Sequence, residues 1–153
     1  MGEKFTVERS QAVTAAPDVV WPKVGDLTQW NDWSPWASKD PNMVSTYTGD
    51  PGEVGSTSSW TGNRKVGEGS MTITATDAPN KVDIDLQFLK PFKDEATVEM
   101  LIEATDDGST VTWRMHGEHS AMTKLMGFFG RTMDKMVGPD FEKGLAKLKT
   151  IVE

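Results

Sequence analysis

The residues best suited to acid–base chemistry form one short run, His116-Gly117-Glu118-His119, between the last expected strand and the C-terminal helix. Imidazole titrates near neutral pH, so His116 and Glu118 are the candidate catalytic residues for proton transfer. A metal site needs at least three converging ligands, and two imidazoles with one carboxylate on a turn are a weak signal for one. We expect no metal and no cofactor, and solvated turn residues are the simpler interpretation of the run.

Two polar residues interrupt the apolar phase of the first expected strand. Arg9 and Gln11 share the phase of Phe5, Val7 and Val13. A buried Arg needs an acidic partner or a polar ligand atom. Either the strand twists so that both side chains reach the rim or a carboxylate, or they orient a guest in an apolar pocket.

Trp and Met supply an unusual share of the apolar surface, since the chain has six Trp and nine Met but one Tyr. Both residue types provide large contact areas, and Met adapts its shape to its neighbours. The cluster of Trp30, Trp33 and Trp36 is either a structural corner or the source of a ring that stacks, with Trp60 or Trp113, on an aromatic ligand.

A Met-rich stripe runs along the first half of the C-terminal segment. Its members recur at helical spacing and are Met122, Leu125, Met126, Phe129, Met133, Met136 and Val137. The second half uses Phe and Leu instead, so the stripe is either core or a pliant pocket wall. Gly127 and Gly130 allow close packing or loosen an entrance, or they belong to a membrane-touching loop. Gly138-Pro139 predicts a break or kink in the helix.

The elements that must position these residues follow from hydrophobic periodicity. A short helix begins near Pro17. Clean alternation of apolar and polar residues predicts strands over residues 5–13, 43–48, 55–61, 70–76, 82–88, 96–103 and 110–115. Alternation is typical of an antiparallel sheet covered on one face, and the remaining segment, residues 121–153, must supply the cover. No strand–helix–strand rhythm is present, which excludes a doubly wound fold.

Length and charge limit the functions that the chain can have. The 153 residues suit a single domain spanning 1–153, and the chain has no Cys, which excludes disulfides and thiolate metal sites. A net charge of −7 argues against nucleic acid and anionic membranes as partners. No signal peptide and no apolar run of about 20 residues is visible, so we expect a cytoplasmic protein without stable membrane insertion, either a monomer or a weak dimer.

At this point the chain resembles the START-like helix-grip (SRPBCC) superfamily, and within it the bacterial polyketide cyclase/dehydratase-like proteins. The resemblance covers nearly the whole chain. The segments that carry it are Val13-Thr14-Ala15-Ala16-Pro17 with Val20-Trp21, Trp30-Asn31-Asp32-Trp33-Ser34-Pro35-Trp36, Gly52-Glu53-Val54-Gly55-Ser56, Trp60-Thr61-Gly62-Asn63, Gly67-Glu68-Gly69-Ser70-Met71-Thr72-Ile73 and Gly138-Pro139-Asp140-Phe141-Glu142-Lys143-Gly144-Leu145.

The resemblance implies an α+β helix-grip fold. A curved antiparallel sheet of about seven strands would wrap round a long C-terminal helix, with two short helices between the first two strands. Relatives include lipid carriers, cyclases and co-chaperones, and fold does not choose among them.

The leading functional hypothesis is a carrier or sensor for a hydrophobic, ring-containing or lipid-like small molecule. The alternatives are a polyketide cyclase/dehydratase-like enzyme and a co-chaperone-like interaction module. The expected pocket lies beneath residues 122–137, and its candidate residues are Arg9, Gln11, Trp33, Trp60, Met71, Phe88, Met100, Trp113, Met115, Met122, Met126, Phe129 and Met133.

Overall fold

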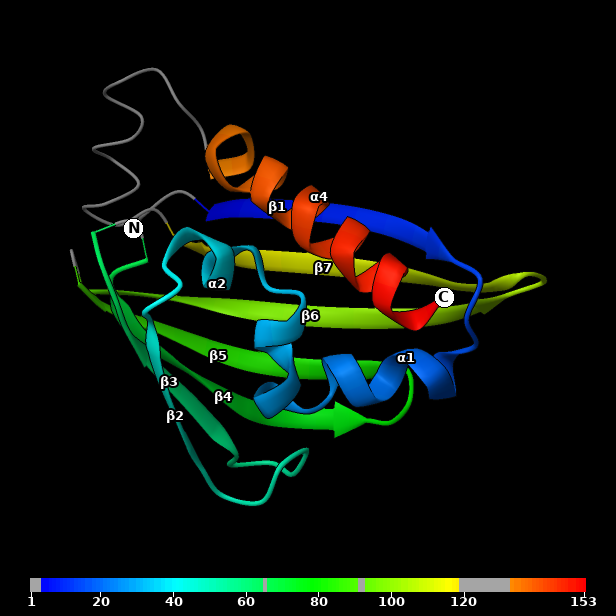
Figure 1. Cartoon of the computed structure of the whole chain (residues 1–153), viewed down its shortest axis with the longest axis horizontal. Helices are drawn as coiled ribbons and strands as arrows, with labels where there is room; N and C mark the ends of the chain where they lie inside the picture. The colour runs from blue at the N-terminus through cyan, green and yellow to red at the C-terminus, as the bar shows by residue number, and fades with distance from the viewer. Residues whose placement is uncertain (1–3, 65, 91–92, 119–132) are drawn as a thin grey trace.

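The computed structural model describes residues 4–64, 66–90, 93–118 and 133–153 (Figure 1). The strands along these residues are β1 (Lys4–Val13), β2 (Val44–Thr48), β3 (Thr57–Thr61), β4 (Glu68–Asp77), β5 (Lys81–Lys90), β6 (Asp94–Thr105) and β7 (Gly108–Glu118). The helices are α1 (Pro17–Val24), the 3-10 helix η1 (Leu27–Asp32), α2 (Pro35–Lys39) and α4 (Met133–Val152).

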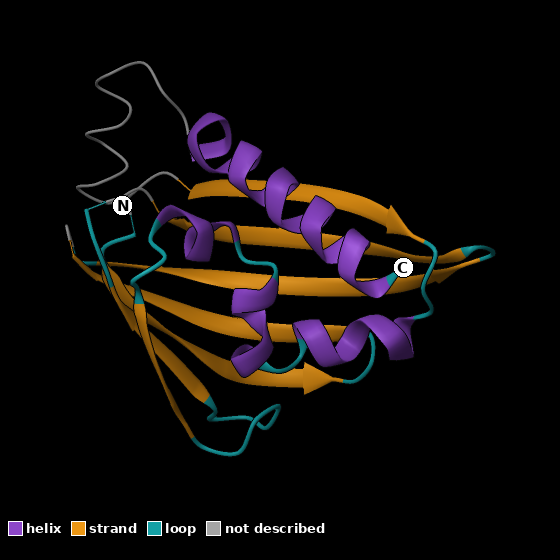
Figure 2. Ribbon diagram, viewed as in Figure 1, coloured by secondary structure: helices purple, strands orange, loops and turns teal. Residues whose placement is uncertain are grey.

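The seven strands form one antiparallel sheet in the order β1-β7-β6-β5-β4-β3-β2. The sheet curves strongly, and all the drawn helices lie against its concave face (Figure 2). The predicted α+β helix-grip fold is therefore confirmed. Between β1 and β2 the chain forms α1 and α2 as expected, and η1 adds a third short helical segment between them.

Two indoles anchor these short helices to one another. Trp30 Nε1 donates to the carbonyl of Val24, and Trp33 Nε1 donates to the carbonyl of Lys23, each at 2.8 Å. Both rings are buried, and their centroids lie 4.7 Å apart. Trp30 and Trp33 therefore hold the end of α1 against η1, which is the structural corner that the Trp cluster predicted.

The concave face of the sheet is the apolar face. Residues paired across neighbouring strands share a face, and one such row contains Ile73, Ile84, Val98, Met115 and Val7. Every member of this row is buried. From α4, Phe141, Leu145 and Leu148 are buried against the same core, so the second half of the C-terminal segment packs on the sheet through its Phe and Leu side chains.

Of the predicted break or kink at Gly138-Pro139, the break is not present. Helix α4 runs continuously through Gly138 and Pro139, so any effect of the proline is at most a bend within one helix. An interior proline costs one hydrogen bond and some steric strain, and the buried side chains that follow it on α4 offset that cost. Of the Met-rich half, residues 121–132 lie outside the described residues.

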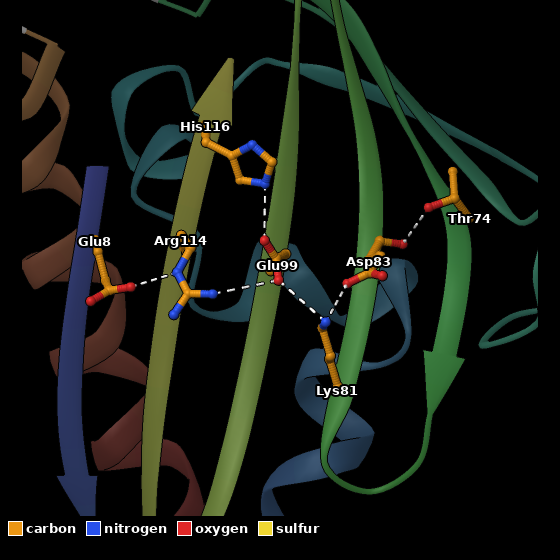
Figure 3. Close-up of polar contacts among 7 residues, drawn as sticks. All are labelled: Glu8, Thr74, Lys81, Asp83, Glu99, Arg114 and His116. Atoms are coloured by element: carbon orange, nitrogen blue, oxygen red, sulfur yellow. Dashed lines mark hydrogen bonds and ion pairs between the residues drawn. The ribbon is translucent and has the colours of Figure 1, made fainter. Parts of the chain in front are cut away.

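The convex face carries a network of charged side chains centred on Glu99 of β6 (Figure 3). Its carboxylate accepts from His116 Nε2 at 2.9 Å and lies 3.3 Å from Lys81 Nζ and 3.5 Å from Arg114 Nη1. Arg114 also pairs with Glu8 on β1. The contacts therefore join β1, β5, β6 and β7 side by side across the sheet.

The network lowers the pKa of Glu99. Burial alone would raise it, but hydrogen bonds from His116 and Lys81, together with the charges of Lys81 and Arg114, bring it below the ordinary value of 4.5. A carboxylate whose folded-state pKa is depressed stabilises the fold above its unfolded-state pKa. That contribution is lost as the pH falls through the folded-state value.

Replacing this carboxylate tests the contribution. Glu99→Gln should lower the free energy of unfolding by about 1 kcal/mol at about pH 7, because the substitution removes a shared, partly buried anion. Urea unfolding at about pH 7 and at the lowest pH at which both proteins still fold should show a difference that shrinks as the pH falls toward the depressed pKa of Glu99. Glu103→Gln, an exposed carboxylate on the same strand, is the control, with an expected change within about 0.5 kcal/mol. An equal loss for Glu99→Gln at both pH values would contradict a role for its charge.

Candidate ligand pocket

A cavity of about 410 Å³ opens between the concave face of the sheet, the short helices and α4. This volume is in the range of small-molecule binding sites. The lining is mostly apolar and consists of Trp30, Asn31, Ser34, Trp36, Met43, Ser45, Ser58, Trp60, Arg64, Val66, Gly67, Met71, Leu86, Phe88, Lys90, Val98, Trp113, Met115, Val137 and Phe141.

A stack of aromatic rings forms one wall of this cavity. Trp113 of β7 lies parallel to Phe141 of α4, with centroids 4.0 Å apart and planes at 5°. The edges of Trp30, Trp33 and Trp36 meet Trp113 at 5.2 to 5.8 Å. The indole nitrogen of Trp113 is buried and has no hydrogen-bond partner among the residues that the structure describes. Since solvent does not reach that nitrogen, a guest in the cavity can contact the ring of Trp113 but cannot accept a hydrogen bond from its N–H group.

Trp60 and Phe88 form the opposite wall, and a glycine makes their arrangement possible. The Trp60 ring lies over Gly69, where an added Cβ would come within 2.6 Å of Trp60 Cη2 and 2.3 Å of the Gln87 carbonyl oxygen. Trp60 Nε1 donates to the Val66 carbonyl at 2.8 Å, and the ring meets Phe88 edge-on at 6.2 Å. A larger residue than glycine at position 69 would displace this wall.

Five of the predicted ligand-binding residues line the cavity. They come from four different strands and are Trp60, Met71, Phe88, Trp113 and Met115. Each lies on the concave face because the alternation of its strand places it there. The periodicity of the sequence was therefore sufficient to predict this part of the site.

The predicted polar anchors on β1 do not line the cavity. Arg9 lies under α4, where Gly138 leaves room for its guanidinium, and its Nε is 3.2 Å from Glu142 Oε2. Gln11 donates from its side chain to the Ala12 carbonyl. The alternative that Arg9 pairs with a carboxylate is thus correct, because β1 is the strand that α4 covers most directly.

Two predicted apolar residues are core residues and not part of the lining. Trp33 is fully buried behind Trp113, and Met100 is fully buried in the sheet's core. Met100 shares the concave face with the lining residues, whereas Trp33 follows η1 and lies on no strand. Alternation predicts that face correctly, but it does not say which part of the face the helices fill.

The candidate catalytic residue His116 lies on the wrong face for chemistry in this cavity. It alternates with Met115, which lines the cavity, and its imidazole joins Glu99 on the convex face (Figure 3). The structure does not describe the side chains of Glu118 and Met133. His119, Met122, Met126 and Phe129 fall outside the described residues altogether, so the predicted Met wall remains a prediction. From α4, Val137 and Phe141 reach the cavity.

Several lining residues were missed by the sequence analysis. Val66 and Arg64 lie between β3 and β4 in a segment without periodicity, so no pattern indicated their direction. Met43 begins the strand predicted over residues 43–48, so its alternation with Val44 was a usable signal. Ser58 had a usable signal, because it is two residues from Trp60 on the same strand and must share its face. Lys90 ends β5 two residues after Phe88, and the same rule applies to it.

Ser58 is one of the polar residues of the lining, together with Asn31, Ser34 and Ser45, and its residue is 6% exposed. Its hydroxyl is a candidate hydrogen-bonding group for a polar atom of a ligand. A group of three or more His, Cys, Asp or Glu that could hold a metal does not occur among the described residues.

A family model described as polyketide cyclase/dehydrase and lipid transport matches residues 4–153. No curated protein matches the chain in sequence. Similar solved structures include protein CV1439 from Chromobacterium violaceum, 12% identical over 97% of this chain and 96% of that one, with a TM-score of 0.70. Another is protein SA2116 of unknown function from Staphylococcus aureus, 11% identical over 99% and 94%, with a TM-score of 0.71.

A third similar structure is DynU16, from the dynemicin biosynthetic locus. It is 13% identical, with 96% of this chain covering 46% of DynU16 and a TM-score of 0.65. Structural similarity at identities this low shows a shared fold. The ligand of each protein has to be inferred from that protein's own residues.

The packing of the cavity wall can be tested at Gly69. Gly69→Ala should lower the free energy of unfolding by about 1–3 kcal/mol, because the added methyl overlaps both the Trp60 ring and a neighbouring strand. Ser70→Ala, at the adjacent and only partly buried position, should change it by less than about 0.5 kcal/mol. Denaturant unfolding of the three proteins measures both values. Equal stabilities would contradict the conclusion that the wall formed by Trp60 and Phe88 requires glycine at position 69.

Proposed function

We propose that this chain, which belongs to the polyketide cyclase/dehydrase and lipid transport family, binds an apolar small molecule in the cavity between the sheet and α4 as a carrier or sensor. The observation that carries the proposal is the cavity itself. Its walls are aromatic, aliphatic and Met side chains, yet they leave about 410 Å³ open. Leaving such surface against water is unfavourable by about 25 cal/mol per Å², and a guest that covers it recovers that free energy.

The form of the wall suits a flat or ring-containing guest. Trp60 with Phe88 on one side and Trp113 with Phe141 on the other present aromatic faces and edges to the same space. Met43, Met71 and Met115 lie between them, and their unbranched side chains repack around guests of different shape. Micromolar affinity requires only part of the available apolar contact, after the cost of ordering the ligand.

The chemistry of the lining favours binding over catalysis. Among the described residues, no His, Asp, Glu or Tyr lines the cavity. General acid–base catalysis needs such a group within hydrogen-bonding reach of the substrate. The candidate His116 is held on the convex face by Glu99. A cyclase-like reaction in this space would thus find no imidazole, carboxyl or phenol group in the described lining.

One finding and one further proposal concern the setting of this activity. None of the described helices combines the length and apolar character that crossing a membrane requires. We propose a water-soluble carrier that exchanges its guest with the surrounding solution through the open side of the cavity.

Filling the cavity tests the proposal. N-phenyl-1-naphthylamine, an uncharged aromatic fluorophore, should bind the wild-type chain with a dissociation constant of about micromolar order. Met71→Trp should weaken this binding at least about tenfold, because the indole occupies the space of the guest. Met43→Trp is a second filling variant, outside the strands, for the case in which Met71→Trp does not fold.

The control is Val54→Trp, which adds the same indole at a position that is exposed and outside the lining. Fluorescence titration of all four proteins compares their affinities. If the folded filling variants bind the fluorophore as tightly as the wild type and the control do, the cavity is not the binding site.

A further inference from the structure

We propose that the ligand of this cavity is an anionic amphiphile, an apolar ring or chain that carries an acid group such as a carboxylate, and that the acid group is held by Arg64 and Lys90. The proposal rests on the proposed function, since it names the chemical class of the guest for the same site. Its basis is the distribution of charge around the cavity, which differs from that of the chain as a whole.

Arg64 and Lys90 are the charged residues of the lining, and no carboxylate belongs to the part of it that the structure describes. The chain as a whole has 23 acidic and 16 basic residues. A lining drawn from such a composition would be expected to contain acids. Two cations without an acid therefore make the local potential at the cavity positive within a negatively charged protein, and this favours an anionic guest.

The sheet register brings these two cations to the same end of the cavity. Lys90, the last residue of β5, pairs with Glu68, the first residue of β4. Arg64 lies in the connection of residues 62–67 that joins β3 to β4 immediately before Glu68. Figure 1 shows this end of β3, β4 and β5 close together, at the side away from α1. A single acid group entering there meets both side chains.

Both cations are available to a ligand. Arg64 forms no ion pair with any residue that the structure describes, and it is exposed. Lys90 has one acidic neighbour, Glu68 Oε2, at 3.9 Å, and the Lys90 side chain is 75% exposed. A contact of that length between exposed groups contributes little. The guanidinium can bind a carboxylate through two parallel hydrogen bonds, and the lysine adds a point charge.

The interior supports the same orientation of the guest. The side of the cavity beyond the cations is formed by Trp60, Phe88 and Met71, which suit an apolar body. The other polar groups of the described lining are hydroxyls and an amide, including the hydroxyl of Ser58. A second charge inside would be buried without a partner, which is costly. The guest therefore carries its charge at one end only.

The test compares two fluorophores that differ only in an acid group. N-phenyl-1-naphthylamine is uncharged, and 8-anilino-1-naphthalenesulfonate is the same ring system with a sulfonate. We expect Arg64→Gln combined with Lys90→Gln to weaken binding of the sulfonate about five- to tenfold and to leave the uncharged probe unchanged within about twofold. Raising the salt concentration from about 0.05 M to about 0.5 M should weaken sulfonate binding to the wild type in the same selective way.

The control variant is Lys143→Gln combined with Lys147→Gln, which removes two exposed cations from α4 outside the lining and so makes the same change in net charge. It should retain the sulfonate affinity of the wild type. An equal loss in the control, an equal loss for both probes, or no loss for either probe overturns the proposal. If the uncharged probe still binds, the proposed function stands even when the proposal of an anionic guest fails. Failure of both probes to bind the wild type would contradict the proposed function and the anionic guest alike.

A membrane surface is the other partner that two exposed cations could contact. Sedimentation with vesicles of anionic phospholipid distinguishes the two. Wild-type protein should stay in the supernatant at about 0.15 M salt, as the net charge of −7 predicts. Cosedimentation that is lost in the Arg64 and Lys90 double variant, with no difference between the two fluorophores, would assign the cations to a lipid surface and overturn the proposal.

Discussion

Strict alternation of side chains along the strands is the constraint on which the rest of this molecule depends. Every residue of the sheet is committed to one face, so neighbours such as Met115 and His116 serve opposite environments. The concave face must be apolar for the helices to pack on it, and the curvature of seven strands makes that face large. Helix α4 and the short helices do not fill it completely. The cavity is the part of the apolar face that remains.

The position of α4 decides where that remaining space lies. The helix is held over β1 by the contact of Arg9 with Glu142 and by the close approach of Arg9 to the backbone at Gly138. Lys39 of α2 pairs with Asp140 at 2.9 Å and adds a second tie on the other side. These contacts place the helix toward the β1 end of the sheet. The uncovered space consequently extends toward β2, β3, β4 and β5, where most of the strand residues of the lining lie.

Sequence periodicity predicted the strands, the covered face and five of the lining residues because these follow from local spacing. It failed where the answer depended on how elements pack. Arg9 looked like a ligand anchor because its phase is apolar, but the phase cannot show that α4 brings Glu142 to it. Met100 lies on the predicted face and is covered by other residues, and Trp33, which lies on no strand, is buried against Trp30 and Trp113. Arg64 lies in a connection without periodicity, so only the structure places it at the cavity.

The same alternation explains how an acidic chain can present a positive cavity. Glu8, Asp83 and Glu99 occupy outward positions of their strands, where they pair with Lys81 and Arg114 across the convex face. Acidic residues at inward positions would be desolvated against the apolar core and are disfavoured. Cations have long side chains whose charged ends reach water from the cavity edge, so they are the charges tolerated there. The net charge of the protein and the charge that a guest meets are therefore set by different faces of one sheet.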